Sequence, residues 1–164
     1  RQGRVEYPSS RFRTYSGNYY RISVPDNWRE LPAGDNVTFA PEGAYGNTRG
    51  QFVYTHGLQV GSIRGVAGSL RTATDRLISE LAQGHRSLRK NGGYEREYVG
   101  RREGLSISLS NVSEVTGRPE IVSVFTTMLR NGDLFYVIAV APQDEYQNYQ
   151  RTFLGILRTV ELSD

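Results

Sequence analysis

The chain contains no cysteine, which excludes disulfide bonds and zinc sites built on thiolates. It also contains no run of 18 apolar residues, so the sequence predicts no membrane-spanning helix. Lysine is almost absent: Lys90 is the only one, and the other 19 of the 20 basic residues are arginines. These arginines are interspersed with 17 acidic residues and form no basic stripe. The composition therefore argues against a nucleic-acid partner.

The length and composition are those of one folded domain. A chain of 164 residues, 37% hydrophobic and 11% aromatic, can bury one substantial core. The polar residues 1–11 include Pro8 and two serines, which predicts a linker or tail before a single domain over residues 12–164. The chain begins at Arg1 without a methionine or a signal-like segment. We therefore expect it to be a mature or excised part of a longer protein.

The segment YYRISVPDNW, residues 19–28, predicts the first strand of the core. Tyr20, Ile22 and Val24 alternate with polar residues, and Pro25 ends the hydrogen-bonded ladder because it has no amide proton. Trp28, the only tryptophan, can then fold back over the apolar face of this strand.

The next segments predict two strands separated by a loop. Residues 36–40 and 51–58 have strand-like composition, whereas residues 41–50 are rich in glycine and predict a loop. In the second strand, His56 falls on the same face as Phe52 and Tyr54.

A long helix is predicted after residue 69, because apolar residues recur at helical spacing from Leu70 to Leu88. Either Ser69 or Thr72 can cap its start. Three basic residues, Arg86, Arg89 and Lys90, lie near its expected end, where the helix dipole stabilises positive charge. Gly92 or Gly93 can then terminate the helix.

The second half of the chain reads mostly as sheet. Strands are predicted at residues 94–99, around residues 105–109, and at residues 121–129 and 134–141. Between the last two strands, Asn131-Gly132 favours a two-residue type I′ turn. A turn of this length sets a strand register in which Met128 lies opposite Phe135.

A closing helix is predicted to open at Pro142, with Asp144 and Glu145 in its first turn. Its buried face is predicted to consist of Tyr146, Tyr149, Phe153, Ile156, Leu157 and Val160. Strands and helices do not alternate along the chain. The fold class expected is therefore α+β, an antiparallel β-sheet flanked by α-helices in an α/β/α sandwich.

Motifs of enzymatic chemistry are missing from the sequence. It contains two histidines, no His-Glu-x-x-His, no phosphate loop ending in Gly-Lys-Ser/Thr and no Gly-x-Ser-x-Gly elbow. We expect no catalytic residue, no metal site and no cofactor. His85 falls in the predicted helix and is expected to be partly exposed there.

One glycine-rich stretch suggests more than packing. Residues 55–65, THGLQVGSIRG, predict a loop in which Gly57 and Gly61 allow close approach of the backbone, with His56 and Arg64 nearby. An ordinary loop crossing a sheet edge, with His56 hydrogen-bonded inside, explains the same pattern. The candidate interaction or ligand site comprises His56, Gly57, Gly61, Arg64, Trp28 and, from the other glycine-rich loop, Tyr45.

The segments YYRISVPDNW, TFAPEGAYG, LRNGDLFYVIAVAP and YQNYQRTFLGILRTVEL together resemble the PsbP-type fold. More narrowly, TFAPEGAYG with YTHGLQVG resembles a domain at the C-terminal end of bacterial zinc metallopeptidases akin to HtpX and the prenyl-protein proteases. The resemblance implies a non-catalytic domain in an extracytoplasmic bacterial setting, with the catalytic motif in a separate domain. It supplies no active-site residue.

Two hypotheses follow from these observations. The first is an interaction or regulatory module that docks on a protein, for instance its own protease domain, through the loops at residues 41–50 and 57–68. The second is a small-molecule or anion-binding domain with a cleft near His56, Arg64 and Trp28. A deep apolar pocket with convergent polar groups would favour the second.

Overall fold

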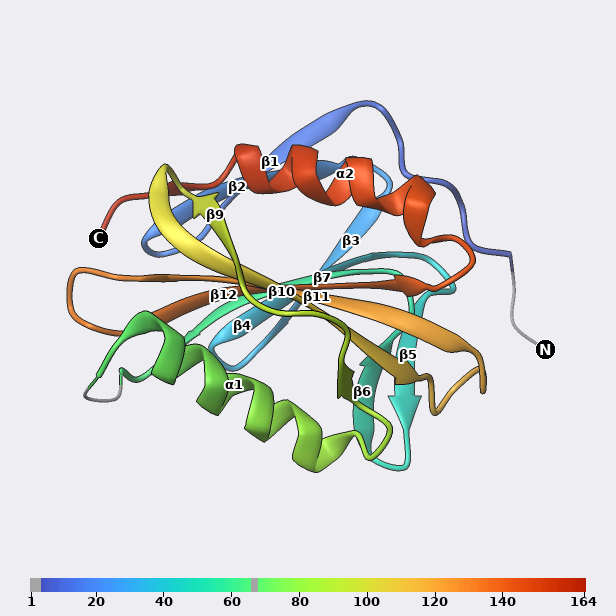
Figure 1. Cartoon of the computed structure of the whole chain (residues 1–164). Coiled ribbons are helices and arrows are strands. Elements are labelled where there is room, and N and C mark those ends of the chain that lie inside the picture. Colours follow the sequence, from blue (N-terminus) through green and yellow to red (C-terminus); the bar gives the residue numbers. More distant parts are fainter. Residues whose placement is uncertain (1–3, 66–67) are drawn as a thin grey trace.

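The protein is an antiparallel β-sheet covered by one helix on each face (Figure 1). The computed structural model describes residues 4–65 and 68–164, and within them the chain forms thirteen strands and two helices. In chain order these are β1 (Phe12–Ser16), β2 (Tyr20–Pro25), β3 (Trp28–Ala33), β4 (Asn36–Pro41), β5 (Tyr45–Thr48), β6 (Gln51–Tyr54), β7 (Gly57–Ile63), α1 (Leu70–Gly84), β8 (Arg89–Lys90), β9 (Glu95–Val99), β10 (Arg102–Val112), β11 (Pro119–Met128), β12 (Leu134–Pro142), α2 (Tyr146–Arg158) and β13 (Glu161–Leu162).

The strands form one large sheet and two small ones. The eight-stranded sheet has the order β3-β4-β7-β12-β11-β10-β8, with β9 also paired to β10. Strands β1, β2 and β13 form a second sheet, and β5 with β6 forms a separate hairpin. All of these pairings are antiparallel, which confirms the predicted α+β class. Among the described residues, neither helix has the length and apolar character needed to cross a bilayer.

Strand β12 divides the interior into two cores. Phe135, Val137 and alternate residues after them pack on the side of α2, with β2 and Trp28. Leu134, Tyr136 and their alternates pack on the opposite side, against α1. Every residue of β12 is buried, as expected of a central strand covered on both faces.

The interpretation of YYRISVPDNW is confirmed. Strand β2 ends at Pro25 with Tyr20, Ile22 and Val24 buried. Trp28 leaves only 1% of its surface exposed, and its ring lies 6.4 Å from that of Phe153 on α2. Trp28 also begins β3, a strand that the sequence did not predict.

Both glycine-rich segments contain a strand where the sequence predicted only a loop. Part of the first, residues 45–48, is β5, and it pairs with β6. The expected strand over residues 51–58 breaks at Thr55 and His56, where the chain passes from this hairpin into the large sheet. Gly57, with φ of +139°, and Gly61 then belong to β7, which lies between β4 and β12.

Glycine is required in β7 because the neighbouring strands come very close. A Cβ atom on Gly57 would lie 2.3 Å from the carbonyl oxygen of Phe39, and one on Gly61 would lie 2.5 Å from the hydroxyl of Tyr136. The glycines therefore serve strand packing, a role that pattern reading mistook for loop flexibility.

Helix α1 starts as predicted but ends early. The Ser69 hydroxyl accepts a hydrogen bond from the amide of Thr72, so Ser69 is the N-cap. The helix stops at Gly84, and a turn closed by the Leu88 amide and the His85 carbonyl returns Leu88 to the core. The basic residues expected in the last turn lie beyond the helix, two of them in β8. The expected stop at Gly92 or Gly93 was wrong.

The turn between β11 and β12 differs from the prediction by one residue. The Leu129 amide donates to the Asp133 carbonyl, and Gly132 takes a positive φ of +91° whereas Asn131 does not. A type I′ turn needs a positive φ at both central residues, so a three-residue loop forms instead. As a result, Met128 pairs with Leu134, and Thr127 pairs with Phe135.

Helix α2 begins four residues later than predicted. Pro142 is the last residue of β12, and Asp144 and Glu145 lie in the turn before the helix. Its predicted buried face is confirmed for Tyr149, Phe153, Ile156 and Leu157, while Tyr146 is half-buried and Val160 is buried just beyond the helix.

The segment before β1 touches this helix. The Tyr7 hydroxyl donates to the carbonyl of Asn148, and its ring lies 5.9 Å from that of Tyr149. The boundary between tail and domain stays a prediction.

Candidate functional site

Of the six residues predicted from sequence, Trp28 and His56 have large side chains that lie in the interior. Trp28 is enclosed by the core beneath α2. His56 is 5% exposed; its Nδ1 lies 2.8 Å from the Thr55 hydroxyl and its Nε2 3.2 Å from a carboxylate oxygen of Glu145. Burial lowers the pKa of His56, because the charged imidazolium is disfavoured away from water, although the neighbouring Glu145 opposes this.

The series Thr55–His56–Glu145 superficially matches a hydroxyl, base and carboxylate arrangement. Thr55 and His56 are each only 5% exposed, so a substrate has no access to either group. The hydroxyl also lies 3.3 Å from the Ala44 carbonyl. These contacts connect the residues between β6 and β7 to the residue that precedes α2. The role of Thr55, His56 and Glu145 is therefore structural.

The other four predicted residues are dispersed. Gly57 and Gly61 are buried within β7. Arg64 lies just beyond that strand and lines an open polar groove that also includes Asp35 and Asp133. Tyr45 on β5 lines a separate, small cavity beside the hairpin. The six residues thus do not converge on one cleft.

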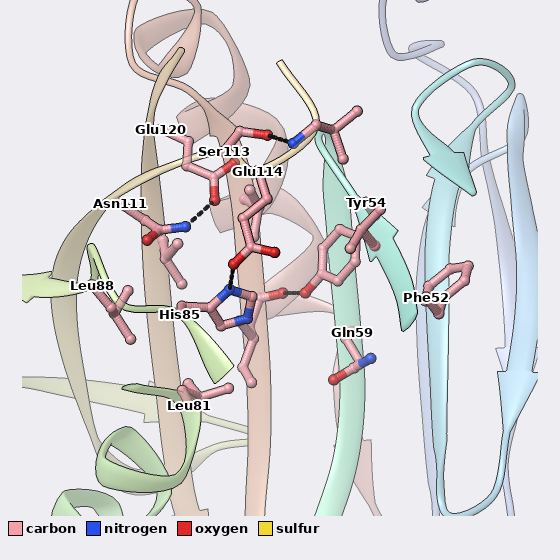
Figure 2. Close-up of a pocket in the computed structure, with 15 residues that line it drawn as sticks. Phe52, Tyr54, Gln59, Leu81, His85, Leu88, Asn111, Ser113, Glu114 and Glu120 are labelled. Atoms are coloured by element: carbon pink, nitrogen blue, oxygen red, sulfur yellow. Dashed lines mark hydrogen bonds and ion pairs between the residues drawn. The ribbon is translucent and has the colours of Figure 1, made fainter. Parts of the chain in front are cut away.

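A different pocket lies on the α1 face of the sheet, and we call it the hairpin pocket (Figure 2). Its volume is about 230 Å³, and it lies between the β5–β6 hairpin, the end of α1 and the turn joining β10 to β11. Its lining residues are Phe52, Val53, Tyr54, Gln59, Leu81, His85, Leu88, Asn111, Ser113, Glu114, Val115, Glu120, Val122, Ile138 and Val140.

Most of the wall of the hairpin pocket is apolar. The floor is formed by side chains of the α1-side core, among them Leu88, Val122 and Ile138. At its mouth, Phe52 and Val115 each leave 39% of their surface exposed. Exposed apolar side chains next to a concave surface are typical of binding sites.

One part of the wall is polar and acidic. Asn111 and Glu120 are paired residues of β10 and β11, and the Asn111 side-chain amide donates to Glu120 at 2.8 Å. The side-chain oxygen of Asn111, Oδ1, is buried and has no hydrogen-bond partner among the described residues. Burial raises the pKa of Glu120, because the carboxylate has lost water.

Glu114 and His85 complete the polar wall near the surface, and Figure 2 shows the Glu114 carboxylate directed at the imidazole. Their Oε1 and Nδ1 atoms are 3.8 Å apart, too far for a hydrogen bond. The Ser113 hydroxyl accepts from the amides of Val115 and Thr116, which holds the turn that carries Glu114.

The sequence contains one signal for this pocket. Asn111 continues the alternating face of Ile107 and Leu109, and Glu120 precedes Val122 and Val124 on the facing strand. Two polar residues that extend buried apolar faces at paired positions indicate a polar insertion in the core. His85 is partly exposed, as predicted, but it is the C-cap of α1 and lines the pocket, which the sequence did not predict.

The lining residues of the hairpin pocket determine which contacts a bound group can make there. Within residues 4–65 and 68–164, no three histidine, aspartate or glutamate side chains are grouped closely enough to hold a metal ion. The pocket instead offers apolar contact along most of its wall and hydrogen-bond acceptors at one end.

No protein-family model matches the chain, and neither does any curated protein sequence. Solved structures do match. PsbP (CyanoP) of Synechocystis sp. PCC 6803 is 14% identical with a TM-score of 0.61, covering 98% of this chain and 96% of its own. The Saccharomyces cerevisiae Ran-binding protein Mog1p is 11% identical with a TM-score of 0.64, covering 95% and 97%.

Mycobacterium tuberculosis LpqN, a protein involved in cell envelope biogenesis, is 14% identical with a TM-score of 0.57, covering 94% of this chain and 91% of its own. These similarities extend over nearly the whole of each chain. They show that the protein has a PsbP-like fold.

Proposed function

We propose that the protein is a non-catalytic interaction domain that docks on another protein through the hairpin pocket. The observation that carries this proposal is the pair Phe52 and Val115, which are both 39% exposed at the mouth of a mostly apolar pocket. Binding energy at protein interfaces concentrates where one side chain fills a desolvated pocket of the partner. The hairpin pocket can receive such a side chain.

The size of the pocket favours a protein partner over a free cofactor. Its volume of about 230 Å³ is below the roughly 300–1,000 Å³ of sites that enclose small-molecule ligands. The alternative, a ligand cleft near His56 and Trp28, has less support because both side chains are buried among core residues.

The parent protein proposed is a bacterial zinc metallopeptidase with this chain as its accessory domain. The support is the resemblance of TFAPEGAYG and YTHGLQVG to such domains, and the second of these segments contributes Tyr54 and Gln59 to the pocket. The partner proposed is the protease domain itself. An extracytoplasmic location agrees with the cell-envelope role given for LpqN, and protein binding agrees with Mog1p being a Ran-binding protein.

Calorimetry between this chain and a metallopeptidase catalytic domain encoded in the same reading frame tests the proposal. We expect saturable binding, weakened at least about tenfold, or 1.4 kcal/mol, by the double substitution Phe52→Ser and Val115→Ser. Phe12→Ser is a matched control, because Phe12 is 40% exposed and lies on β1, away from the pocket. It should bind as the wild type does.

Two results would count against parts of this proposal. Absence of binding would remove the protease domain as the partner. Binding that Phe52→Ser with Val115→Ser leaves unchanged would place the docking surface elsewhere on the molecule.

A further inference from the structure

From the charges of the hairpin pocket we infer that it receives an arginine side chain of the partner protein. This inference rests on the proposed function and specifies its chemistry. The stem of the arginine would lie along the apolar wall, and its guanidinium would reach Asn111, Glu114 and Glu120.

Among the described residues, Oδ1 of Asn111 is a buried acceptor in the pocket wall that is left unpaired. Asn111 is 6% exposed, and its Oδ1 atom has no hydrogen-bond partner within the described part of the chain. A buried polar atom without a partner costs free energy, and a bound N–H donor would remove that cost. The amide nitrogen of Asn111 already donates to Glu120, so the side-chain atom left without any described partner is the acceptor Oδ1.

The hairpin pocket also contains a buried carboxylate that pairs with no described arginine or lysine. Glu120 is 9% exposed, and it forms no ion pair with a basic residue among those described. Arg118, close to it in the chain, pairs with Asp144 and Glu145 instead. Buried carboxylates are normally paired, so Glu120 offers a place for a cation from outside the chain.

The path from the pocket mouth to these groups suits a long side chain with a charged end. Glu114 is exposed near the mouth, 3.8 Å from the His85 imidazole, while Glu120 is buried, so carboxyl groups line the path from the surface inward. Leu81, Leu88 and Val122 flank this path with apolar surface. Arginine has a three-carbon stem and a planar head with five donors, which suits both the apolar wall and several acceptors at once.

Capped arginine, N-acetyl-arginine methylamide, is the probe for a direct test by NMR titration of the intact chain. We expect chemical-shift changes at pocket residues with a Kd on the order of 1 mM, as suits one charge-assisted contact and a short apolar stem. The matched control ligand is capped citrulline, which has the same shape without the charge. It should bind at least about tenfold more weakly.

Substitution of the carboxylates tests the same contact from the protein side. Glu120→Gln keeps an oxygen for Asn111 but removes the charge, and together with Glu114→Gln it should weaken capped arginine about tenfold or more. Glu95→Gln is the control, because Glu95 is exposed on β9 outside the pocket lining.

The inference is overturned if capped arginine causes no saturable shifts in the pocket, if citrulline binds equally well, or if the double variant binds arginine unchanged. Agmatine carries the same guanidinium group together with a free amine. If agmatine binds tenfold more tightly than capped arginine, the natural ligand of the pocket is a small molecule and not a protein side chain. Failure of capped arginine with intact binding of the protease domain removes this inference and leaves the proposed function. The reverse pattern removes the protease domain as partner and leaves the arginine site.

Discussion

His56 acts as a structural residue at the junction of three elements. Its two ring nitrogens contact Thr55, which precedes β7, and Glu145, which precedes α2. Because burial lowers its pKa, the fold favours the neutral imidazole. A single residue thereby links the hairpin to the α2 layer and makes that link sensitive to pH.

His56→Ala should lower the free energy of unfolding by about 1–3 kcal/mol at pH 7.5, since Thr55 and Glu145 lose a buried partner. The folded pKa is below the unfolded value of 6.5, so the unfolded state binds more protons between the two values. The wild type therefore loses stability as the pH falls below about 6.5. The difference between wild type and variant should shrink at pH 5.

Thermal and urea melts of both proteins at the two pH values measure this effect. Equal stability of wild type and His56→Ala at pH 7.5 would show that the hydrogen bonds contribute nothing. A difference that grows toward pH 5 would contradict the direction of the pKa shift.

Among the elements, β7 shows how one strand can depend on glycine. Gly57 has a φ of +139°, and its Cα lies so close to β4 that an added Cβ would meet the Phe39 carbonyl at 2.3 Å. A backbone carbonyl in a central sheet cannot move aside without breaking the ladder between β4 and β7. The strand therefore accepts no side chain at this position.

Gly57→Ala should destabilise the protein by about 2–5 kcal/mol, from the strained φ and the clash together. Gly46→Ala is the matched control: Gly46 is also in a strand, β5, and an added Cβ would meet nothing within 4 Å. Its effect should stay within about 0.5 kcal/mol. Chemical denaturation of both variants checks the pair, and equal stabilities would refute the close-approach argument.

Across the whole molecule, β12 couples the two cores. Its residues alternate between the α2 side, with Phe135, and the α1 side, with Leu134. Neither core can lose its packing without disturbing the strand that both share. We therefore expect the domain to unfold as one cooperative unit.

Phe135→Ala should cost about 3–5 kcal/mol, because Phe135 is fully buried and its removal leaves a cavity. Tyr98→Ala, at a side chain that is 60% exposed, should change stability by no more than about 0.5 kcal/mol. Trp28 fluorescence reports the α2 side, and far-UV circular dichroism reports both helices. The two signals should shift together in Phe135→Ala, and two separate transitions would contradict coupling through β12.

Local patterns were enough to predict the α+β class, the buried face of α2, the Ser69 alternative for the start of α1 and the burial of Trp28. Each of these depends on side-chain periodicity or on capping chemistry within a few residues. Such information is present in the sequence because the hydrophobic effect acts on every buried face in the same way.

The tertiary structure decided which residues meet. Gly57 and Gly61 have the same local signature in a loop and in a crowded strand, and only the approach of β4 and Tyr136 distinguishes the two. The hairpin pocket likewise brings together β6, the end of α1 and the β10–β11 pair, which are distant from one another in the chain. Long-range pairing and burial place the acceptors of Asn111 and Glu120 beside the apolar wall, and periodicity along one segment carries no information about such contacts.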